Sequence, residues 1–309
     1  MKNITTQWAG ALPVKAPCVI KGMPLEVYHS QCCEGPSFSS SNLRRCFEVN
    51  GGSMLHMHSE WSGNPQRIEQ DDDTPHFVMG RALHHLALGE KLFTESFAVR
   101  PTIWKDWKTN DAKEWREARH RQGKAVLTPD DVRGLIGMVR ALHKEKLVRE
   151  GILGGMIERS IIWRDKETGL FMKARPDAIP TDSGDFCDLK TTTSVARYGD
   201  LTSAVRNYGY HQQAALVIEG AKIVAGVEPS SFTFLFIEKK PPHAVAPLVL
   251  KPTMIELGHK MNRAARMKIA KCLESGHWPS PRDGHIVSID LGERYSGDAM
   301  SEVNQYVGG

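Results

Sequence analysis

The strongest constraint on the fold lies in residues 231–238, where three phenylalanines alternate with Thr233, Leu235 and Ile237. Successive side chains of a strand point to opposite faces, so this pattern predicts a strand that is buried on both faces. Such a strand belongs inside a sheet that other elements cover on both sides.

The segments around it predict a mixed α/β core. Three short strands are predicted at residues 156–163, 170–176 and 185–189, the first two joined by a turn. A helical stretch over residues 195–219, stopped by Gly220, leads to the phenylalanine-rich strand, and a last helix is predicted over residues 252–274. The order β-β-β-α-β followed by a helix is typical of a mixed sheet with helices packed against it.

The first 150 residues are predicted to be mainly helical and irregular. Residues 50–73 show neither strand nor helix periodicity and are predicted to form a long loop. The acidic run 71–73 lacks the alternating ligands of a calcium loop, so it is interpreted as solvated charge before a helix. A capping threonine followed by proline opens helices at residues 74–88 and 128–150, the second one stopped by Gly151.

Composition is that of an ordinary globular protein. The 309 residues include 40 Lys and Arg against 36 Asp and Glu, a formal net charge of +4 that is too small to identify a partner. We interpret the chain as a single domain with an N-terminal part (1–150), an α/β core (151–280) and a C-terminal tail (281–309).

A cytoplasmic location is expected. No run approaches the roughly 18 apolar residues of a membrane span, and prolines interrupt the one apolar region near the N-terminus, unlike a signal peptide. The six cysteines are too few and too scattered for a disulfide framework, so reduced thiols are predicted.

Charged side chains gather where the predicted strands end. Asp177 follows the second strand, and Asp188 and Lys190 lie two residues apart in the third, so their side chains share one face. Paired carboxylates offer the hard oxygen ligands that Mg²⁺ and Mn²⁺ prefer, and Lys190 would orient a water molecule or stabilise developing charge. A turn with two surface aspartates is the alternative interpretation.

Pro176-Asp177 followed by Asp188-Leu189-Lys190 resembles the motif of the PD-(D/E)-x-K nucleases. Gly80-Arg-Ala-Leu-His84 is similar to the G-x-x-x-H motif of their RecB-like branch, and Tyr210-His-Gln-Gln213 resembles the Q-x-x-x-Y motif of that branch. The chain is most similar to the RecE-type exonucleases (exodeoxyribonuclease VIII), whose opening matches residues 23–29 and 39–43. This resemblance, from about residue 22 to 280, implies a restriction-endonuclease-like α/β core with a mixed central sheet flanked by helices and a helical N-terminal elaboration.

The resemblance also implies roles for individual residues. The metal ligands would be His84, Asp177, Asp188 and the main-chain carbonyl of Leu189, and Lys190 would be catalytic beside the two carboxylates. Glu158 matches an upstream acid of related exonucleases, and Gln213 matches the glutamine of the branch. Val217 stands where the branch has tyrosine, and Cys272 is the lone cysteine near the C-terminus, so no iron–sulfur cluster is expected.

His84 is expected to reach the metal because its helix packs its Gly80 face against the strand ends, whereas His85 points about 100° away. Apart from the resemblance, either histidine would be assigned to the core, and a helix-surface amide is an equally good interpretation of Gln213. Zinc is not expected at His56 and His58, nor at His29, Cys32 and Cys33. Phosphate contacts and solvated surface charge are alternative interpretations of Arg197, Arg206, Lys239 and Lys240.

The function implied by the resemblance is a Mg²⁺-dependent exodeoxyribonuclease, with Mn²⁺ as a substitute. It would degrade linear double-stranded DNA from its ends in the 5′ to 3′ direction and leave 3′ single strands for recombination. A homo-oligomeric ring and a single-strand annealing protein of the RecT kind would be its partners, with no membrane involved. An endonuclease on the same fold and a catalytically silent DNA-binding module are the alternatives, and no P-loop motif for ATP is present.

Overall fold

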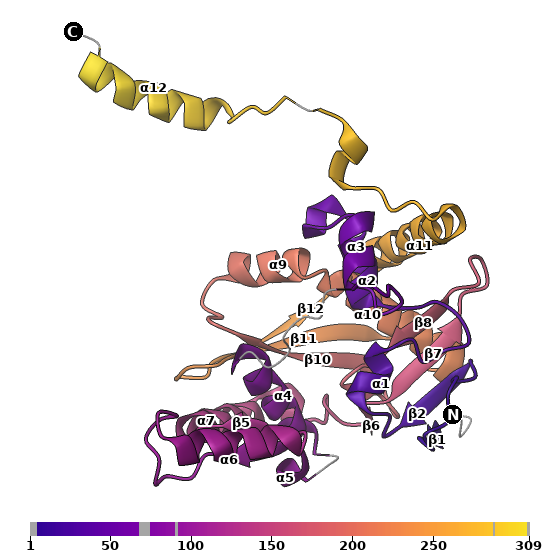
Figure 1. Cartoon of the computed structure of the whole chain (residues 1–309), viewed down its shortest axis with the longest axis vertical. Coiled ribbons are helices and arrows are strands. Elements are labelled where there is room, and N and C mark those ends of the chain that lie inside the picture. Colours follow the sequence, from indigo (N-terminus) through magenta and orange to yellow (C-terminus); the bar gives the residue numbers. More distant parts are fainter. Residues whose placement is uncertain (1–4, 68–74, 90–91, 287, 308–309) are drawn as a thin grey trace.

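The computed structural model describes residues 5–67, 75–89, 92–286 and 288–307, and strands flanked by helices form its centre (Figure 1). A five-stranded mixed sheet has the order β1-β2-β7-β8-β3, and a three-stranded mixed sheet has the order β10-β11-β12. These strands are β1 (Thr5–Gln7), β2 (Cys18–Lys21), β3 (Ser37–Ser39), β7 (Ser160–Arg164), β8 (Phe171–Ala174), β10 (Asp185–Thr192), β11 (Ser231–Glu238) and β12 (Val245–Val249). Two small sheets pair β4 (Phe97–Val99) with β5 (Ala125–Leu127) and β6 (Met156–Ile157) with β9 (Ala178–Ile179).

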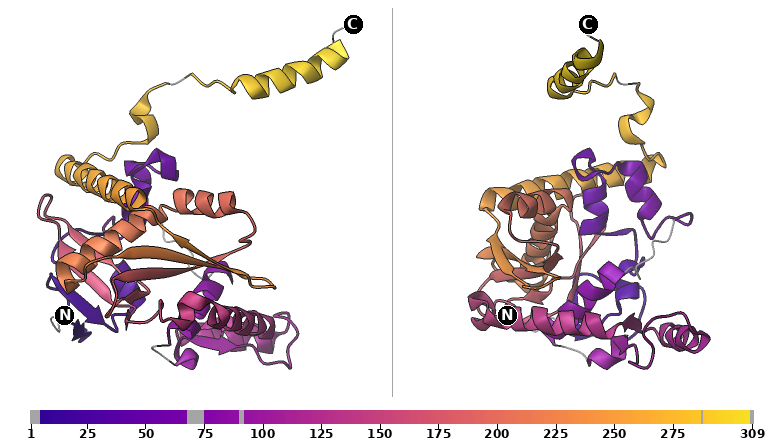
Figure 2. Two further views of the ribbon diagram at one scale, coloured as in Figure 1. Left: turned by 180° about the vertical axis from the view of Figure 1, so that it is seen from behind. Right: turned by 90° about the vertical axis from the view of Figure 1, so that its left-hand side faces the viewer.

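Helices cover both sides of these sheets (Figure 2). On one side lie α2 (Ser40–Arg45), α3 (Met54–Glu60), α9 (Tyr198–Asn207), α10 (Tyr210–Gly220) and α11 (Pro252–Ser275). On the other side lie α4 (Pro75–Leu88), α5 (Phe93–Ser96), α6 (Asn110–Arg121) and α7 (Pro129–Lys144). The remaining helices are α1 (Leu25–His29), α8 (Lys146–Arg149), α12 (Glu293–Val307) and the short turns η1 (Glu48–Asn50), η2 (Ala221–Ala225) and η3 (Pro281–Gly284).

Strand β11 confirms the prediction of burial on both faces. Its three phenylalanines pack in the core beneath α10 and α11, whereas Leu235 and Ile237 pack in a second core with residues of α4 and α7. Strand β10 runs parallel to β11, with Asp188 paired with Phe234 and Lys190 with Phe236. The predicted mixed α/β fold is therefore present.

The strands differ from the prediction in two places. The strand expected over residues 156–163 is divided into β6 and β7 because Glu158 adopts a left-handed backbone conformation, with φ +47°. The N-terminal part is also less helical than expected, since β1, β2 and β3 all join the five-stranded sheet and β2 runs antiparallel to β7. Long-range pairing of short strands leaves little trace in local sequence periodicity.

The helices differ from the prediction at their glycines. Gly209, with φ +63°, divides the stretch expected over residues 195–219 into α9 and α10. The prediction that Gly220 stops the helix is wrong. The helical stretch continues as the π-helix η2 and stops at Gly226, with φ +66°. A Cβ atom at Gly220 would lie 2.5 Å from the buried ring of Trp163, so this glycine serves close packing.

Two helix ends agree with the sequence, but the helix predicted over residues 128–150 is divided into α7 and α8 at Glu145, whose backbone is extended. Helix α7 begins at the predicted capping residue Thr128, which forms a capping box with Asp131, and α11 ends at the left-handed Gly276. The loop predicted over residues 50–73 contains α3, which Ser53 caps by accepting a hydrogen bond from His56 N–H. The acidic run 71–73 and the predicted cap at Thr74 lie outside the described residues.

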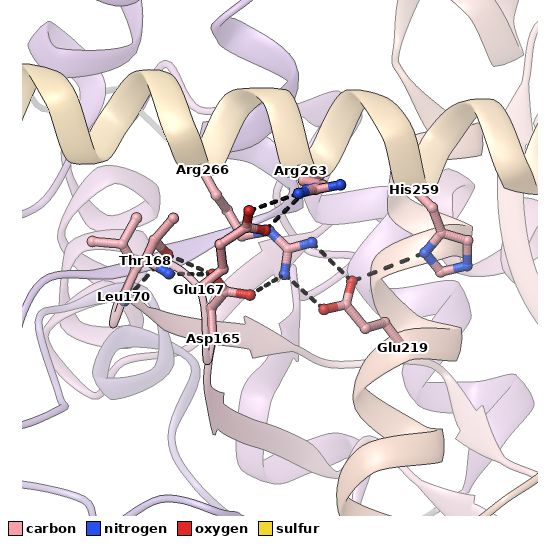
Figure 3. Close-up of polar contacts among 8 residues, drawn as sticks. All are labelled: Asp165, Glu167, Thr168, Leu170, Glu219, His259, Arg263 and Arg266. Carbon is pink, nitrogen blue, oxygen red and sulfur yellow. Dashed lines mark hydrogen bonds and ion pairs between the residues drawn. The ribbon is translucent and has the colours of Figure 1, made fainter.

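Helix α11 holds α10 and the turn between β7 and β8 in place (Figure 3). The buried guanidinium of Arg266 bonds Asp165, at 2.9 Å, and Glu219 of α10, at 2.6 Å. The two helices touch at Gly258, where a Cβ atom would lie 2.3 Å from the carbonyl oxygen of His211. The position of α10 over the sheet is thus fixed by both packing and charge.

The C-terminal segment projects away from the sheets and ends in α12 (Figure 2). None of the described helices combines the length and the hydrophobicity needed to cross a membrane. All six cysteines are free thiols.

Candidate functional site

Asp188 and Lys190 lie side by side on β10, on the face covered by α10. The Lys190 Nζ atom is 2.5 Å from Asp188 Oδ1, and these side chains are 18% and 3% exposed. Gln213 on α10 donates a hydrogen bond from Nε2 to Asp188 Oδ2, at 2.5 Å. The period of two in β10 thus brings the predicted pair together, and α10 adds the predicted glutamine.

Asp177 reaches the edge of β10 from the segment between β8 and β9. Its Oδ2 atom accepts a hydrogen bond from the backbone N–H of Leu189, at 2.7 Å. The N–H and C=O groups of one strand residue point to the same edge, so the Leu189 carbonyl also faces the Asp177 side. The role of this carbonyl as a metal ligand stays a prediction.

His84 comes to the same place from α4, across 93 residues of sequence. Its Nδ1 atom lies 3.2 Å from Asp177 Oδ1. His85 points elsewhere, with its ring against Phe93 and Phe97 at centroid distances of 6.0 and 5.6 Å. The expectation that Gly80 is needed for close packing is wrong, because a Cβ atom there would meet only the Thr191 hydroxyl, at 3.9 Å.

The charges of these side chains shift one another's pKa values. Burial opposes a charge on His84, but the adjacent Asp177 carboxylate outweighs it and raises the pKa of His84 to about 9. Burial acts against the charge of Asp177 too, yet His84 holds the pKa of Asp177 below its usual value. Burial raises the pKa of Asp188, although Lys190 acts in the opposite direction. Two neighbouring carboxyl groups with opposed pKa shifts are typical of a functional site.

Tyr210 belongs to the site, although the sequence did not single it out as a contact of Lys190. The Lys190 Nζ atom lies 4.7 Å from the centre of its ring, within the range of a cation–π contact. Tyr210 precedes Gln213 by three residues, so both side chains are on one side of α10. That spacing is the signal that would have found it.

Other predicted residues lie apart from these contacts. The backbone N–H of Glu158 donates to the Asp177 carbonyl at 2.9 Å, but its exposed side chain has no contact with the site side chains in the described structure. Val217 is buried in the core, 2% exposed, so it does not face a substrate. Arg197, Arg206 and Lys240 are exposed and Lys239 is half-buried, which leaves both interpretations of these cations open.

The oxygen donors fit a divalent cation. Asp177 and Asp188 are buried carboxylates, and Asp188 Oδ1 accepts no hydrogen bond among the described residues, the ion pair with Lys190 apart. The described residues do not, however, hold three His, Cys, Asp or Glu side chains in the arrangement of a closed metal site. His84 is turned to Asp177, and it would bind a metal only after losing its proton.

Comparison with known proteins places this constellation in a family. Residues 39–288 match a family described as "PDDEXK-like domain of unknown function (DUF3799)". The chain belongs to this PDDEXK-like family. Membership of the PD-(D/E)-x-K nuclease superfamily is therefore confirmed, whereas the closer affiliation with the RecE type stays a prediction.

A solved structure supports the fold. A candidate exonuclease from Eubacterium rectale superposes with a TM-score of 0.57 at 13% identity, over 88% of this chain and 97% of its own. The structure of SSO0001 matches with a TM-score of 0.27 at 14% identity, over 62% of this chain and 85% of its own, which is too distant to support an argument. No curated protein matches the chain.

Proposed function

We propose that this PDDEXK-like protein is a Mg²⁺-dependent deoxyribonuclease. One observation carries the proposal: two buried carboxylates, Asp177 and Asp188, converge with Lys190 at the edge of β10. A protein that only binds DNA has no need to bury like charges together, because their desolvation costs free energy.

Each residue of the site has its own role in the proposed phosphodiester hydrolysis. Asp177 and Asp188, with the Leu189 carbonyl and His84 as further donors, would hold a divalent cation, which supplies Lewis-acid polarisation of the phosphate and lowers the pKa of water. Lys190 is placed by Asp188 and Tyr210 to orient the attacking water or to stabilise charge on the phosphate. Gln213 fixes the orientation of Asp188 through its hydrogen bond.

In its finer form, the proposal is an exonuclease that degrades linear double-stranded DNA 5′ to 3′ and leaves 3′ single strands for recombination. Its support is the resemblance of the sequence motifs to RecE-type exonucleases, together with the similar fold of the Eubacterium rectale protein. A homo-oligomeric ring and an annealing protein of the RecT kind belong to the same proposal, as does a cytoplasmic location.

The deciding experiment compares linear with closed circular duplex DNA in Mg²⁺. Release of nucleotides from the linear form alone, with a 5′ label lost before a 3′ label, is expected. Cuts in the circular form would indicate an endonuclease instead, and binding without cleavage by the wild type would indicate a silent module. Asp188→Asn is the control, because it keeps the side-chain shape but removes the charge.

The assembly can be tested separately from the chemistry. Light scattering of the active protein should give the mass of an oligomer, and a monomer with full activity would contradict the ring. Stimulation by an annealing protein encoded nearby should be measurable as longer 3′ strands.

A further inference from the structure

The segment between β4 and β5 is rich in both tryptophan and cations. Residues 100–124 contain eight Lys and Arg against four Asp and Glu. The formal net charge of this segment is therefore +4, equal to that of the whole chain. Trp104, Trp107 and Trp115 lie within it, all half-buried, on the loop before α6 and on α6 itself. The segment belongs to the same group of helices as α4, which carries His84 (Figure 1).

Arginines are stacked on these rings. The guanidinium carbons of Arg100 and Arg116 lie 5.3 and 5.1 Å from the centre of the Trp107 ring, and that of Arg119 lies 5.3 Å from the Trp115 ring. The rings also contact one another: Trp107 and Trp115 are stacked at 6.4 Å, and Trp104 is tilted against Trp115 at 6.0 Å. Stacking on a ring holds a guanidinium plane in place without using its N–H groups.

These arginines form no ion pair within the described structure, although Arg119 donates a hydrogen bond to Gln122 Oε1 at 3.0 Å. No carboxylate of the described residues forms an ion pair with Arg100, Arg116 or Arg119, in contrast to Arg263, which bonds Glu167 at 2.7 Å. The Nε atoms of Arg100 and Arg119 are buried and have no hydrogen-bond partner there. No cation lies over the Trp104 ring among the described contacts, and Trp104 is only half-buried, so part of its side chain is accessible to another planar group.

We propose that the six side chains of this Trp–Arg surface (Arg100, Trp104, Trp107, Trp115, Arg116 and Arg119) bind single-stranded DNA. Phosphates would occupy the guanidinium edges, and a base would stack on Trp104, the combination that non-specific single-strand binding uses. Duplex DNA fits the surface less well, because its bases are already stacked inside the helix. The inference rests on the proposed deoxyribonuclease function and assigns it a surface for an unpaired strand.

Binding is measured by fluorescence anisotropy of a labelled oligodeoxythymidine in EDTA, where hydrolysis cannot contribute. Trp104→Ala should weaken binding about tenfold, the loss of one base–aromatic stack, and Trp104→Phe should restore most of it. Arg116→Gln should reduce the slope of log K against log salt concentration by about 0.7, as expected for the loss of one phosphate contact to a single strand. Arg140→Gln on α7 removes the same charge from an exposed position of the same lobe and should change neither quantity.

Three results would overturn the inference. They are wild-type binding by both Trp104→Ala and Arg116→Gln, absence of oligodeoxythymidine binding by the wild type, and equally tight binding of a hairpin duplex with equal losses in the variants. If the wild type cleaves DNA while the Trp104 and Arg116 variants bind normally, only this inference fails. If the wild type binds through these residues but hydrolyses nothing in Mg²⁺ or Mn²⁺, the proposed function fails instead.

Discussion

Asp188 and Lys190 illustrate at the residue scale how a site constrains stability. Their charges are buried and 2.5 Å apart, so each compensates the desolvation of the other. Lys190→Met leaves the Asp188 carboxylate without its partner and should lower the free energy of unfolding by about 3–5 kcal/mol. Asp188→Asn together with Lys190→Met removes both charges and should recover much of that loss.

Urea unfolding of the wild type, both single variants and the double variant measures this coupling. Both Lys190→Met and the double variant should lack nuclease activity, so the recovery of stability would be independent of function. A double variant no more stable than Lys190→Met would show that the two charges do not compensate each other.

His84 and its neighbour His85 provide a matched pair for metal binding. Because His84 faces Asp177 and His85 packs against phenylalanines, His84→Ala should weaken Mn²⁺ binding about tenfold or more, whereas His85→Ala should mainly lower the melting temperature. Calorimetric titration of Mn²⁺ into each variant distinguishes them without any turnover. Equal Mn²⁺ affinities of wild type and His84→Ala would remove His84 from the metal site.

The sequence predicted the part of the site that depends on local geometry. The shared face of Asp188 and Lys190 follows from strand periodicity alone. The place of His84 did not follow from local geometry, because only tertiary packing brings α4 to β10, and there the resemblance supplied the residue. Tyr210 was quoted in a motif but its contact with Lys190 depends on how α10 is rotated, which the sequence does not reveal.

At the scale of elements, two helix glycines differ in their surroundings: Gly80 has free space beside it, whereas Gly220 is closely packed. Gly80 in α4 has room for a methyl group, so Gly80→Ala should stabilise the protein by about 0.5–1 kcal/mol through helix propensity. Gly220 lies against the Trp163 ring, which is 1% exposed, so Gly220→Ala should destabilise the protein by about 1–3 kcal/mol through overpacking.

Thermal melting of the two alanine variants checks this pair of predictions directly. Shifts of the same sign in both would contradict the packing described for one of the two glycines. The sequence predicts a helix stop at Gly220, because a glycine after an apolar helical stretch usually has that role. Its neighbour Trp163 is on β7, 57 positions earlier in the sequence.

The C-terminal segment is separate from the core at the scale of the whole molecule. Among the described residues, no hydrogen bond or ion pair joins residues 288–307 to the rest of the chain, and the segment projects away from the sheets. Removal of residues 286–309 should therefore change the free energy of unfolding by less than about 0.5 kcal/mol. Urea unfolding of the shortened chain checks this, with light scattering as a control for any change in assembly.

Helix α11 has a consequence for the order in which the molecule is made. It is synthesised after every residue of the proposed active site, yet it holds α10, and with it Gln213 and Tyr210, through Arg266 and the crossing at Gly258. Strand β2 likewise cannot pair until its partner β7, about 140 residues later in the sequence, has been synthesised. A chain still attached to the ribosome before residue 275 has emerged thus lacks a secured α10, so the proposed active site is assembled only once synthesis of the core is complete.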